Sequence, residues 1–482
     1  MTLLRTSIFI LFTASTIAQA DLQSDVQKIV NSAELHKGRP GICLIDTSTG
    51  NTIVQISANT VMIPASNQKL LTTGAALHIL GPSFEFQTLL VQKEDNLTLL
   101  GDGDPTIGDA ELHGLIDWKS ENQFLDKELQ PWVDAVVASG MTEIKTLFVD
   151  DRIFDQNFVH PSWPADQINN WYCAQVSGLN YHLNVVHFYP SPQSGTTAFL
   201  GDISPRMKWV AFGNNTSSKI GKKNGSSFWV ARPPNSNKMT ARGNVNSTHK
   251  SPVKVAFHNP ALVFGKTLAD ALRAHAIKVN EVKQVAQDSP PTTGKVIFSN
   301  TTPLQTALKR SNTDSHNMYA ESILKRISAQ ATGRPGTFDE GATVIEAVIN
   351  QRLNESMRGV VVADGSGMSR ENRISPKTLA RWLASFDLSD PAGKSLLESL
   401  ATPGHGTLDT RFKDIPLGDA MVHAKSGYLR GVCSLSGYIT FKHRAPIAFS
   451  IIVNDVKGTV RGAKKMQERI IKSAIKYATE SD

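Results

Sequence analysis

Ser66-Asn67-Gln68-Lys69 is the stretch of sequence that decides the fold. Two further stretches follow it along the chain, Ser315-His316-Asn317 and Lys425-Ser426-Gly427. In this order they form an S-x-x-K, S-x-N and K-[ST]-G set, which is typical of serine acyl-transfer enzymes that use a lysine as base. Each stretch alone is weak evidence, because the shorter patterns recur elsewhere, S-x-x-K at Ser247, Ser251 and Ser322 and S-x-N at Ser57 and Ser120. Order and local context therefore have to select among them.

The context of Ser66 indicates the start of a helix. Pro64 precedes it, an apolar run follows, and Gly81-Pro82 ends the pattern. In the first turn, unpaired N–H groups and the positive end of the helix dipole favour a developing alkoxide. Lys69 lies three residues on, on the same face, and a lysine held in a dry cleft beside a second cation can lose its proton and act as base. The ordinary alternative for a lone S-x-x-K is a serine cap at a solvated helix start.

The other two motifs are expected at a turn and on a strand. Helical patterns on either side of residues 311–314 place Ser315 in a turn and Asn317 at a helix restart, although Ser and Asn are also common as simple turn formers. Residues 422–426 alternate as in a strand, and residues 432–440 follow Gly431 as a hairpin partner. Gly427 would let a substrate backbone lie against the strand edge.

The motif set resembles the D-alanyl-D-alanine carboxypeptidase/endopeptidase family, the type 4 penicillin-binding proteins of peptidase family S13. The resemblance runs from about residue 25 to the C-terminus and is weakest between about 200 and 250. His316 stands where Asp is common, and Ser426 where Thr is common; neither change removes a needed hydroxyl or amide. Three supporting strings resemble the family as well: Gly101-Asp102-Gly103-Asp104-Pro105, Asp364-Gly365-Ser366-Gly367-Met368-Ser369-Arg370 and Gly404-His405-Gly406-Thr407-Leu408.

The spacing of the motifs predicts a catalytic domain split by an insertion. Ser66 and Ser315 are 249 positions apart, which leaves room for one or two additional modules of ~100 residues each. The expected fold class is α+β, with a serine β-lactamase/DD-peptidase-like catalytic domain, an antiparallel sheet with helices on both sides, and a mainly-β insertion. The expected ranges are 21–85 and 295–482 for the catalytic domain and 86–294 for the insertion, with a small β module at about 200–250.

The resemblance implies an activity and a role for each motif residue. The activity is hydrolysis of the terminal D-Ala-D-Ala bond of peptidoglycan stem peptides, with D-Ala-diamino acid cross-links as further substrates and β-lactam antibiotics as covalent inhibitors. Ser66 is the expected nucleophile, Lys69 its base and Ser315 a proton relay. The expected substrate-binding residues are Asn317, Lys425, Ser426, Gly427 and, through its N–H, Tyr428. No cofactor is needed.

Three alternatives remain open at this point. A β-lactamase shares the motifs, but the long first gap and the lack of an obvious deacylating Glu motif argue against it. A transpeptidase shares the acylation half of the reaction, and only product analysis separates it. The third alternative is from a different functional class: a wall-binding protein that keeps the enzyme fold but has lost its activity. The presence of all three motifs argues against it.

The N-terminus predicts the compartment. Arg5 precedes an apolar run, and Ala18-Gln19-Ala20 offers small residues for cleavage, so residues 1–20 are predicted to be a secretory signal peptide and the mature protein to be periplasmic. No further segment approaches the ~20 apolar residues of a membrane span.

Composition and charge limit the classes of binding partner that can be expected. The net charge of +7 is spread, with no nucleic-acid-binding motif, so a weak preference for anionic wall polymer or a membrane surface is expected instead. The C-terminal helix pattern, residues 464–478, fits a membrane-surface helix or, alternatively, a helix packed on the catalytic sheet. Cys43, Cys173 and Cys433 are too few for a disulfide framework, and the 13 histidines lack metal-ligand spacing, so no metal is expected. The sequence leaves the oligomeric state open.

Overall fold

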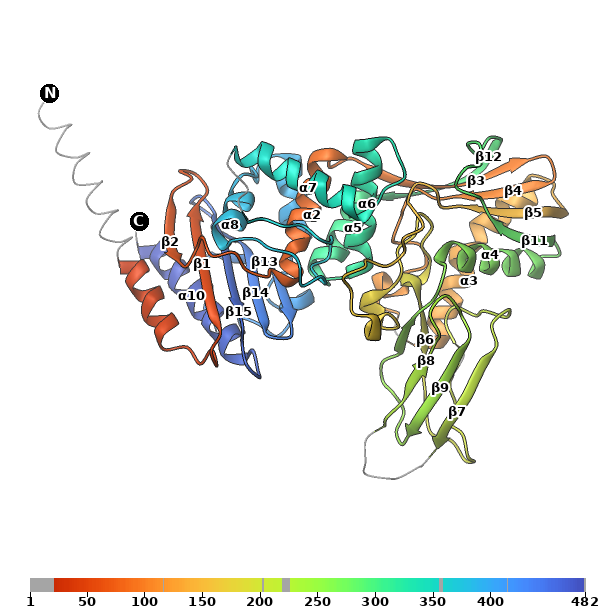
Figure 1. Ribbon diagram of the computed structural model, residues 1–482, viewed down its shortest axis with the longest axis horizontal. Helices are drawn as coiled ribbons and strands as arrows, with labels where there is room; N and C mark the ends of the chain where they lie inside the picture. The colour runs from red at the N-terminus through yellow and green to blue at the C-terminus, as the bar shows by residue number, and fades with distance from the viewer. Residues whose placement is uncertain are drawn as a thin grey trace, which may run out of the picture. The chain divides into compact units, whose positions relative to one another are not determined.

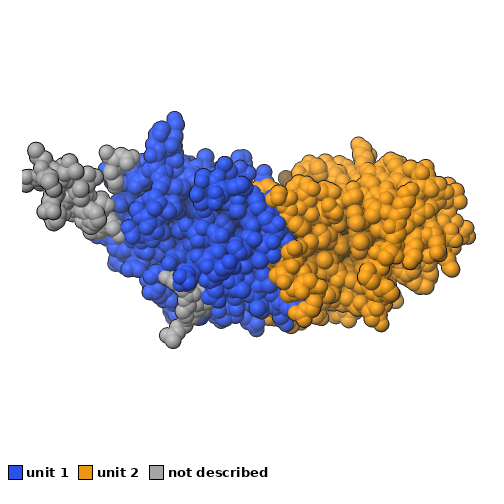
Figure 2. All heavy atoms as spheres, turned by 90° about the horizontal axis from the view of Figure 1, so that it is seen from above, with its two compact units in different colours: residues 1–82, 308–316, 338–482 blue, residues 83–307, 317–337 orange. Residues whose placement is uncertain are grey.

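The structure, a computed structural model, describes residues 21–115, 117–201, 203–218, 226–354, 359–413 and 415–480. The predicted signal peptide, residues 1–20, lies outside the described residues. The chain forms two compact units, coloured separately in Figure 2. Unit 1 comprises residues 1–82, 308–316 and 338–482, and unit 2 comprises residues 83–307 and 317–337.

Unit 1 is built on an antiparallel five-stranded sheet in the order β13-β14-β15-β1-β2. Its strands are β1 (Arg39–Asp46), β2 (Thr52–Ile56), β13 (Met421–Leu429), β14 (Val432–Thr440) and β15 (Ile447–Asn454). β15 is buried along its whole length and β14 at all but its last position, because both lie inside the sheet with both faces covered. The predicted hairpin is confirmed: β13 pairs with β14, and Leu429 faces Val432 across the turn.

Helices cover both faces of this sheet. On one face, α10 (Arg461–Glu480) buries its apolar side, including Met466, Ile470 and Ile471, in one core with the sheet (Figure 1). The packed-helix alternative is therefore the correct one, and this apolar face does not meet a membrane. On the other face, α8 (Pro376–Ala384) contacts β1 and β15. Further helices of unit 1 include residues 21–31, which pack into the same core as α10, and α2 (Gln68–Ile79), α7 (Phe338–Leu353) and α9 (Pro391–Ser399).

Unit 2 contains a second five-stranded sheet, in the order β11-β5-β4-β3-β12, in which β5 runs parallel to both of its neighbours. Its strands are β3 (Glu85–Lys93), β4 (Asn96–Leu100), β5 (Glu143–Asp150), β11 (Lys278–Gln284) and β12 (Lys295–Pro303). α3 (Trp118–Ala138) and α4 (Pro260–Ala274) share its apolar core. The insertion thus contains the α-helices α3 and α4 besides the expected strands; α3 is hard to foresee because it is largely polar and contains Pro131.

The predicted small module around residues 200–250 contains a three-stranded sheet, in the order β7-β9-β8, whose apolar core is shared with neighbouring segments of unit 2, including α4. Its strands are β7 (Phe212–Ser218), β8 (Trp229–Ala231) and β9 (Met239–Val245), and nearby β6 (Val185–Phe188) pairs with β10 (Val253–Ala256).

The contact grouping differs from the expected domain ranges on the C-terminal side of the insertion. β12 pairs with β3, so residues 295–307 group with unit 2. α6 (Asn317–Thr332) also belongs to unit 2, where Lys325 forms an ion pair of 2.6 Å with Asp155. Among the described residues, no helix is both long and apolar enough to cross a membrane.

Candidate active site

Ser66 sits in a sharp turn at the entrance to α2. It lies in the short 3-10 helix η1 (Ala65–Asn67), so the α-helix begins slightly later than the sequence pattern indicated. Ala65 has a φ of +49°, a conformation that costs free energy for a residue with a side chain. Gly367 packs against this turn so closely that a Cβ there would be 1.9 Å from the Ala65 carbonyl oxygen. The strained turn is therefore enclosed by a second loop.

The Lys69 side chain lies beside the Ser66 hydroxyl. It is 0% exposed, and Nζ lies 3.3 Å from Ser66 Oγ and 2.7 Å from the carbonyl oxygen of Ser366. A carbonyl oxygen only accepts, so Lys69 donates an N–H to Ser366. A neutral amine held by that bond can turn its lone pair toward the Ser66 hydroxyl. The arrangement can deprotonate the serine without a histidine.

The loop that carries Ser366 was missed as a functional element by sequence reasoning. The Asp364 carboxylate accepts the N–H groups of Gly367 at 2.8 Å and Ser369 at 2.6 Å, and the Asn372 amide at 2.7 Å. These bonds fix the turn that presents the Ser366 carbonyl to Lys69. The Asp-Gly-Ser-Gly string is a turn signal in its own right, but sequence alone does not say which side chain the turn faces.

Lys425 is buried near Lys69. Its side chain is 0% exposed, and Nζ donates to the carbonyl oxygen of Ser426 at 2.7 Å. Burial lowers the pKa of Lys425 well below its usual value, the positive charge of Lys69 lowers it further, and Asp314 opposes the shift. Lys425 is thus poised to gain from a carboxylate that enters the site, because such a partner favours the charged amine.

Gly427 lets β13 approach Ser66 closely. A Cβ there would lie 2.2 Å from Ser434 Oγ and 3.0 Å from the Ser66 nitrogen. β13 is an edge strand, and the N–H of Ala424 points outward, to the Ala401 carbonyl at 2.8 Å. Main-chain groups of an antiparallel edge strand alternate in direction, so the N–H groups of Ser426 and Tyr428 point to the same outer edge as that of Ala424.

Ser315 follows an anchored helix end. α5 (Leu304–Thr313) stops before it, and Ser315 itself has a φ of +64°. Asn312, near the end of α5, donates to Thr73 Oγ1 of α2 at 3.0 Å and to Ser399 Oγ at 2.8 Å. These bonds attach the turn that carries Ser315 to the helix of Ser66 and Lys69.

Asn317 is the first residue of α6 and belongs to unit 2, two residues along the chain from Ser315. Its Nδ2 donates to the Tyr172 carbonyl oxygen at 2.9 Å, which sets the orientation of the amide. Within unit 1, the structure brings Ser66, Lys69, Lys425 and Gly427 together, with Ser426 and Tyr428 on the adjoining strand edge. Asn317 is held by contacts inside unit 2.

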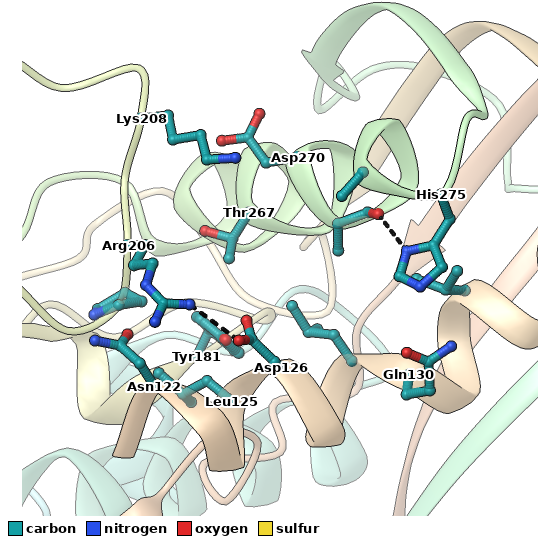
Figure 3. A pocket seen from close by; sticks show the side chains of 15 residues that line it. Asn122, Leu125, Asp126, Gln130, Tyr181, Arg206, Lys208, Thr267, Asp270 and His275 are labelled. Carbon is teal, nitrogen blue, oxygen red and sulfur yellow. Dashed lines mark hydrogen bonds and ion pairs between the residues drawn. The ribbon is translucent and has the colours of Figure 1, made fainter. Parts of the chain in front are cut away.

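Two features of unit 2 lie outside the predicted motifs. One is a pocket of about 380 Å³ lined by α3, α4 and residues 205–208, where Arg206 pairs with Asp126 at 2.9 Å (Figure 3). The other is a buried cluster of Glu121, His182 and His187, the one group among the described residues whose donor atoms could hold a metal ion.

Comparison with known proteins gives the chain a family. A family model described as the D-Ala-D-Ala carboxypeptidase 3 (S13) family matches residues 22–474. The chain is 26% identical over 472 residues to a D-alanyl-D-alanine carboxypeptidase of Actinomadura sp. strain R39, covering 92% of this chain and 83% of that one. It is 27% identical over 442 residues to a carboxypeptidase of Mycolicibacterium smegmatis, covering 89% of this chain and 79% of that one.

The fold agrees with a solved structure. The crystal structure of penicillin binding protein 4 from Haemophilus influenzae matches with a TM-score of 0.75 at 20% identity, covering 95% of this chain and 99% of that one. The match confirms the predicted α+β fold, and the family model confirms the resemblance drawn from the three motifs. The chain therefore belongs to the D-Ala-D-Ala carboxypeptidase 3 (S13) family and is a serine-type D-Ala-D-Ala carboxypeptidase.

Proposed function

We propose that Ser66, Lys69 and Ser315 carry out the peptidase reaction on peptidoglycan stem peptides, removing the terminal D-Ala and also cutting D-Ala-diamino acid cross-links. The observation that carries this assignment is the position of Lys69, whose Nζ is held between Ser66 Oγ at 3.3 Å and the Ser366 carbonyl oxygen at 2.7 Å. A buried amine in hydrogen-bond reach of a hydroxyl at a helix entrance is the arrangement of an activated serine nucleophile.

In the first half of the reaction, Ser66 Oγ attacks the carbonyl carbon of the penultimate D-Ala while Lys69 Nζ takes the hydroxyl proton. The oxyanion is stabilised by the N–H groups of Ser66 and Tyr428. The C–N bond then breaks, and the proton that Lys69 took passes through Ser315 to the leaving amine, which leaves Lys69 neutral again. The products are a Ser66 ester and free D-Ala. In the second half, Lys69 takes a proton from the water that attacks the ester and returns it to Ser66 Oγ as the ester bond breaks, which releases the shortened peptide.

The remaining motif residues position the substrate. Lys425 and Ser426 hold the terminal carboxylate, since a carboxylate restores the charge that burial disfavours on Lys425. The glycine at 427 allows the peptide backbone to lie along the edge of β13, and Asn317 binds the upstream amide. A cross-linked peptide has a free carboxylate next to its scissile bond as well, which supports endopeptidase activity.

β-Lactams are proposed to acylate Ser66 by the same route. A second crystal structure of the H. influenzae protein, with a TM-score of 0.69, contains a bound β-lactam, which supports this for a chain of the same fold.

The proposed location is the periplasm, reached through cleavage after Ala20. N-terminal sequencing of the mature protein tests it: a chain that begins at Asp21 is expected, and one that keeps residues 1–20 contradicts it.

The experiment that tests the function is incubation with purified disaccharide-pentapeptides and cross-linked dimers, with the products identified by mass spectrometry. Loss of one D-Ala and opening of the dimers are expected for the wild type and not for Ser66→Ala. New cross-links in the presence of an acceptor amine would indicate a transpeptidase. Fast turnover of penicillin with intact peptides would indicate a β-lactamase, and no turnover of either substrate a non-catalytic protein.

A further inference from the structure

Three side chains from separate stretches of unit 2 meet away from solvent. Glu121 lies in the first turn of α3, His182 in the 3-10 helix η5 (His182–Asn184) and His187 on β6. Each side chain is at most 2% exposed, and one donor atom from each lies within 4.8 Å of the others. We propose that this cluster binds a divalent first-row transition-metal ion, with Zn²⁺ as the probe, as a site separate from the peptidase centre.

The distances suit neighbouring ligands of one ion. Glu121 Oε1 lies 3.0 Å from His182 Nε2 and 2.8 Å from His187 Nδ1. Ligands about 2.1 Å from an ion and at right angles to each other, as in an octahedral site, are separated by about 3.0 Å. Two imidazole nitrogens and one carboxylate oxygen on one face of an octahedron form a known arrangement for divalent metals.

The hydrogen bonds around the cluster leave His182 Nε2 facing an acceptor. His182 Nδ1 lies 2.8 Å from the Val185 carbonyl oxygen, so this nitrogen carries a proton. In a neutral ring, Nε2 then presents a lone pair to Glu121 Oε1, and two acceptors 3.0 Å apart repel unless a cation or a proton lies between them. The Tyr189 hydroxyl donates to Glu121 Oε2 at 2.8 Å. Metal-ligating histidines and carboxylates are commonly oriented by such second partners.

His187 brings a second imidazole to the same carboxylate oxygen. Its Nδ1 lies 2.8 Å from Glu121 Oε1, which His182 Nε2 also approaches at 3.0 Å. No hydrogen-bond partner is found for His187 Nε2 among the described residues, although the ring is buried. One carboxylate oxygen that faces two imidazole nitrogens is an arrangement that a shared cation stabilises.

The backbone at the site gives the ion a structural role. His182, Leu183 and Asn184 all have positive φ values, +52°, +57° and +56°. Consecutive residues in this region are strained and persist only where the surroundings hold them. An ion on His182 and His187 would fix this turn between η5 and β6 and tie it to α3. Motif spacing could not reveal such a site, because Glu121 and His182 are 61 positions apart.

The test uses the full chain, stripped with a chelator and titrated with Zn²⁺ by calorimetry, with metal content measured after dialysis. One Zn²⁺ per chain and a higher Tm are expected. His187→Gln and Glu121→Gln should weaken binding by at least about 100-fold, and Tyr189→Phe, which removes only the supporting hydroxyl, by roughly 10- to 100-fold. His275→Gln, at an exposed histidine of the same unit, is the matched control and should bind as the wild type does.

Co²⁺ in place of Zn²⁺ should give a ligand-field spectrum that His187→Gln alters.

Circular dichroism and the Tm show whether each variant has folded, and penicillin acylation of Ser66, in the other unit, keeps this test separate from that of the peptidase function. If Glu121→Gln fails to fold, Tyr189→Phe still decides. Equal Zn²⁺ uptake by the wild type, His187→Gln and Tyr189→Phe would overturn the proposal. So would a stripped wild-type chain whose Tm does not respond to Zn²⁺, which would identify the cluster as a buried ion pair.

Discussion

Asn67 Nδ2 donates a 2.6 Å hydrogen bond to the main-chain carbonyl oxygen of Lys425. Asn67, the residue directly after the proposed nucleophile Ser66, therefore holds the strand that carries the third motif. Asn67→Ala would remove this hydrogen bond, at a cost of about 0.5–1.5 kcal/mol. We expect a lower Tm and slower acylation by penicillin. Asn51→Ala, at an exposed asparagine, is the control. Unchanged acylation in Asn67→Ala would show that β13 is positioned without this bond.

Ser66 should be the residue that labelled penicillin acylates. Ser66→Ala is expected to remain folded and to take no label, because the hydroxyl beside Lys69 Nζ is gone. Ser247→Ala and Ser251→Ala are the controls, because both serines are exposed and each begins another S-x-x-K string. Both variants should label as the wild type does. Peptide mapping of the label to another serine would refute the assignment.

Lys69→Ala should lose roughly 10²–10⁴-fold in acylation rate, the usual contribution of a general base. The fold should persist, since α2 packs through its many other buried residues. The readouts are the acylation rate and the circular dichroism spectrum. The interpretation fails if a folded Lys69→Ala chain acylates at close to the wild-type rate.

The parts of this site that sequence could predict are those encoded locally. The helix after Ser66 and the hairpin around Gly431 follow from apolar periodicity and turn residues within short windows, and both are present. The contact between Lys69 and Ser366 joins residues 297 positions apart, so no local pattern encodes it. The same holds for the grouping of α6 with unit 2, which depends on partners such as Asp155. Burial, which lowers the pKa of Lys425, is likewise a property of the assembled core.

The lowered pKa of Lys425 predicts a pH-dependent stability. Its pKa in the folded chain lies below the unfolded value of about 10.4, so between these two values the unfolded chain binds more protons and stability rises with pH. Below the folded-state pKa the cost of the buried charge is fully present. Lys425→Met removes this cost and should be more stable than the wild type at neutral pH while losing peptide hydrolysis.

Denaturant unfolding of both chains over a range of pH measures this difference. The stability advantage of Lys425→Met should shrink as the pH rises through the folded-state pKa toward the unfolded one. A constant difference across the alkaline range, or a less stable variant at neutral pH, would mean that the buried amine is compensated by partners such as Asp314 and the Ser426 carbonyl.

Gly427→Ala separates the packing of β13 from its role beside Ser66, the proposed nucleophile. The new methyl group would meet Ser434 Oγ at 2.2 Å and the Ser66 nitrogen at 3.0 Å. We expect both stability and acylation to fall. The double variant Gly427→Ala/Ser434→Ala removes the first clash and keeps the second. Its Tm should therefore be close to that of Ser434→Ala alone, while its acylation stays slower than that of Ser434→Ala.

Ser434→Ala alone is the baseline, because it loses the 2.6 Å hydrogen bond from Ser434 to the Pro64 carbonyl oxygen. Tm and acylation rate are measured on all four chains. If acylation recovers together with stability in the double variant, the glycine is needed only for packing against β14. If it does not, Gly427 is required because the Ser66 N–H must stay open to the oxyanion that forms on the substrate carbonyl.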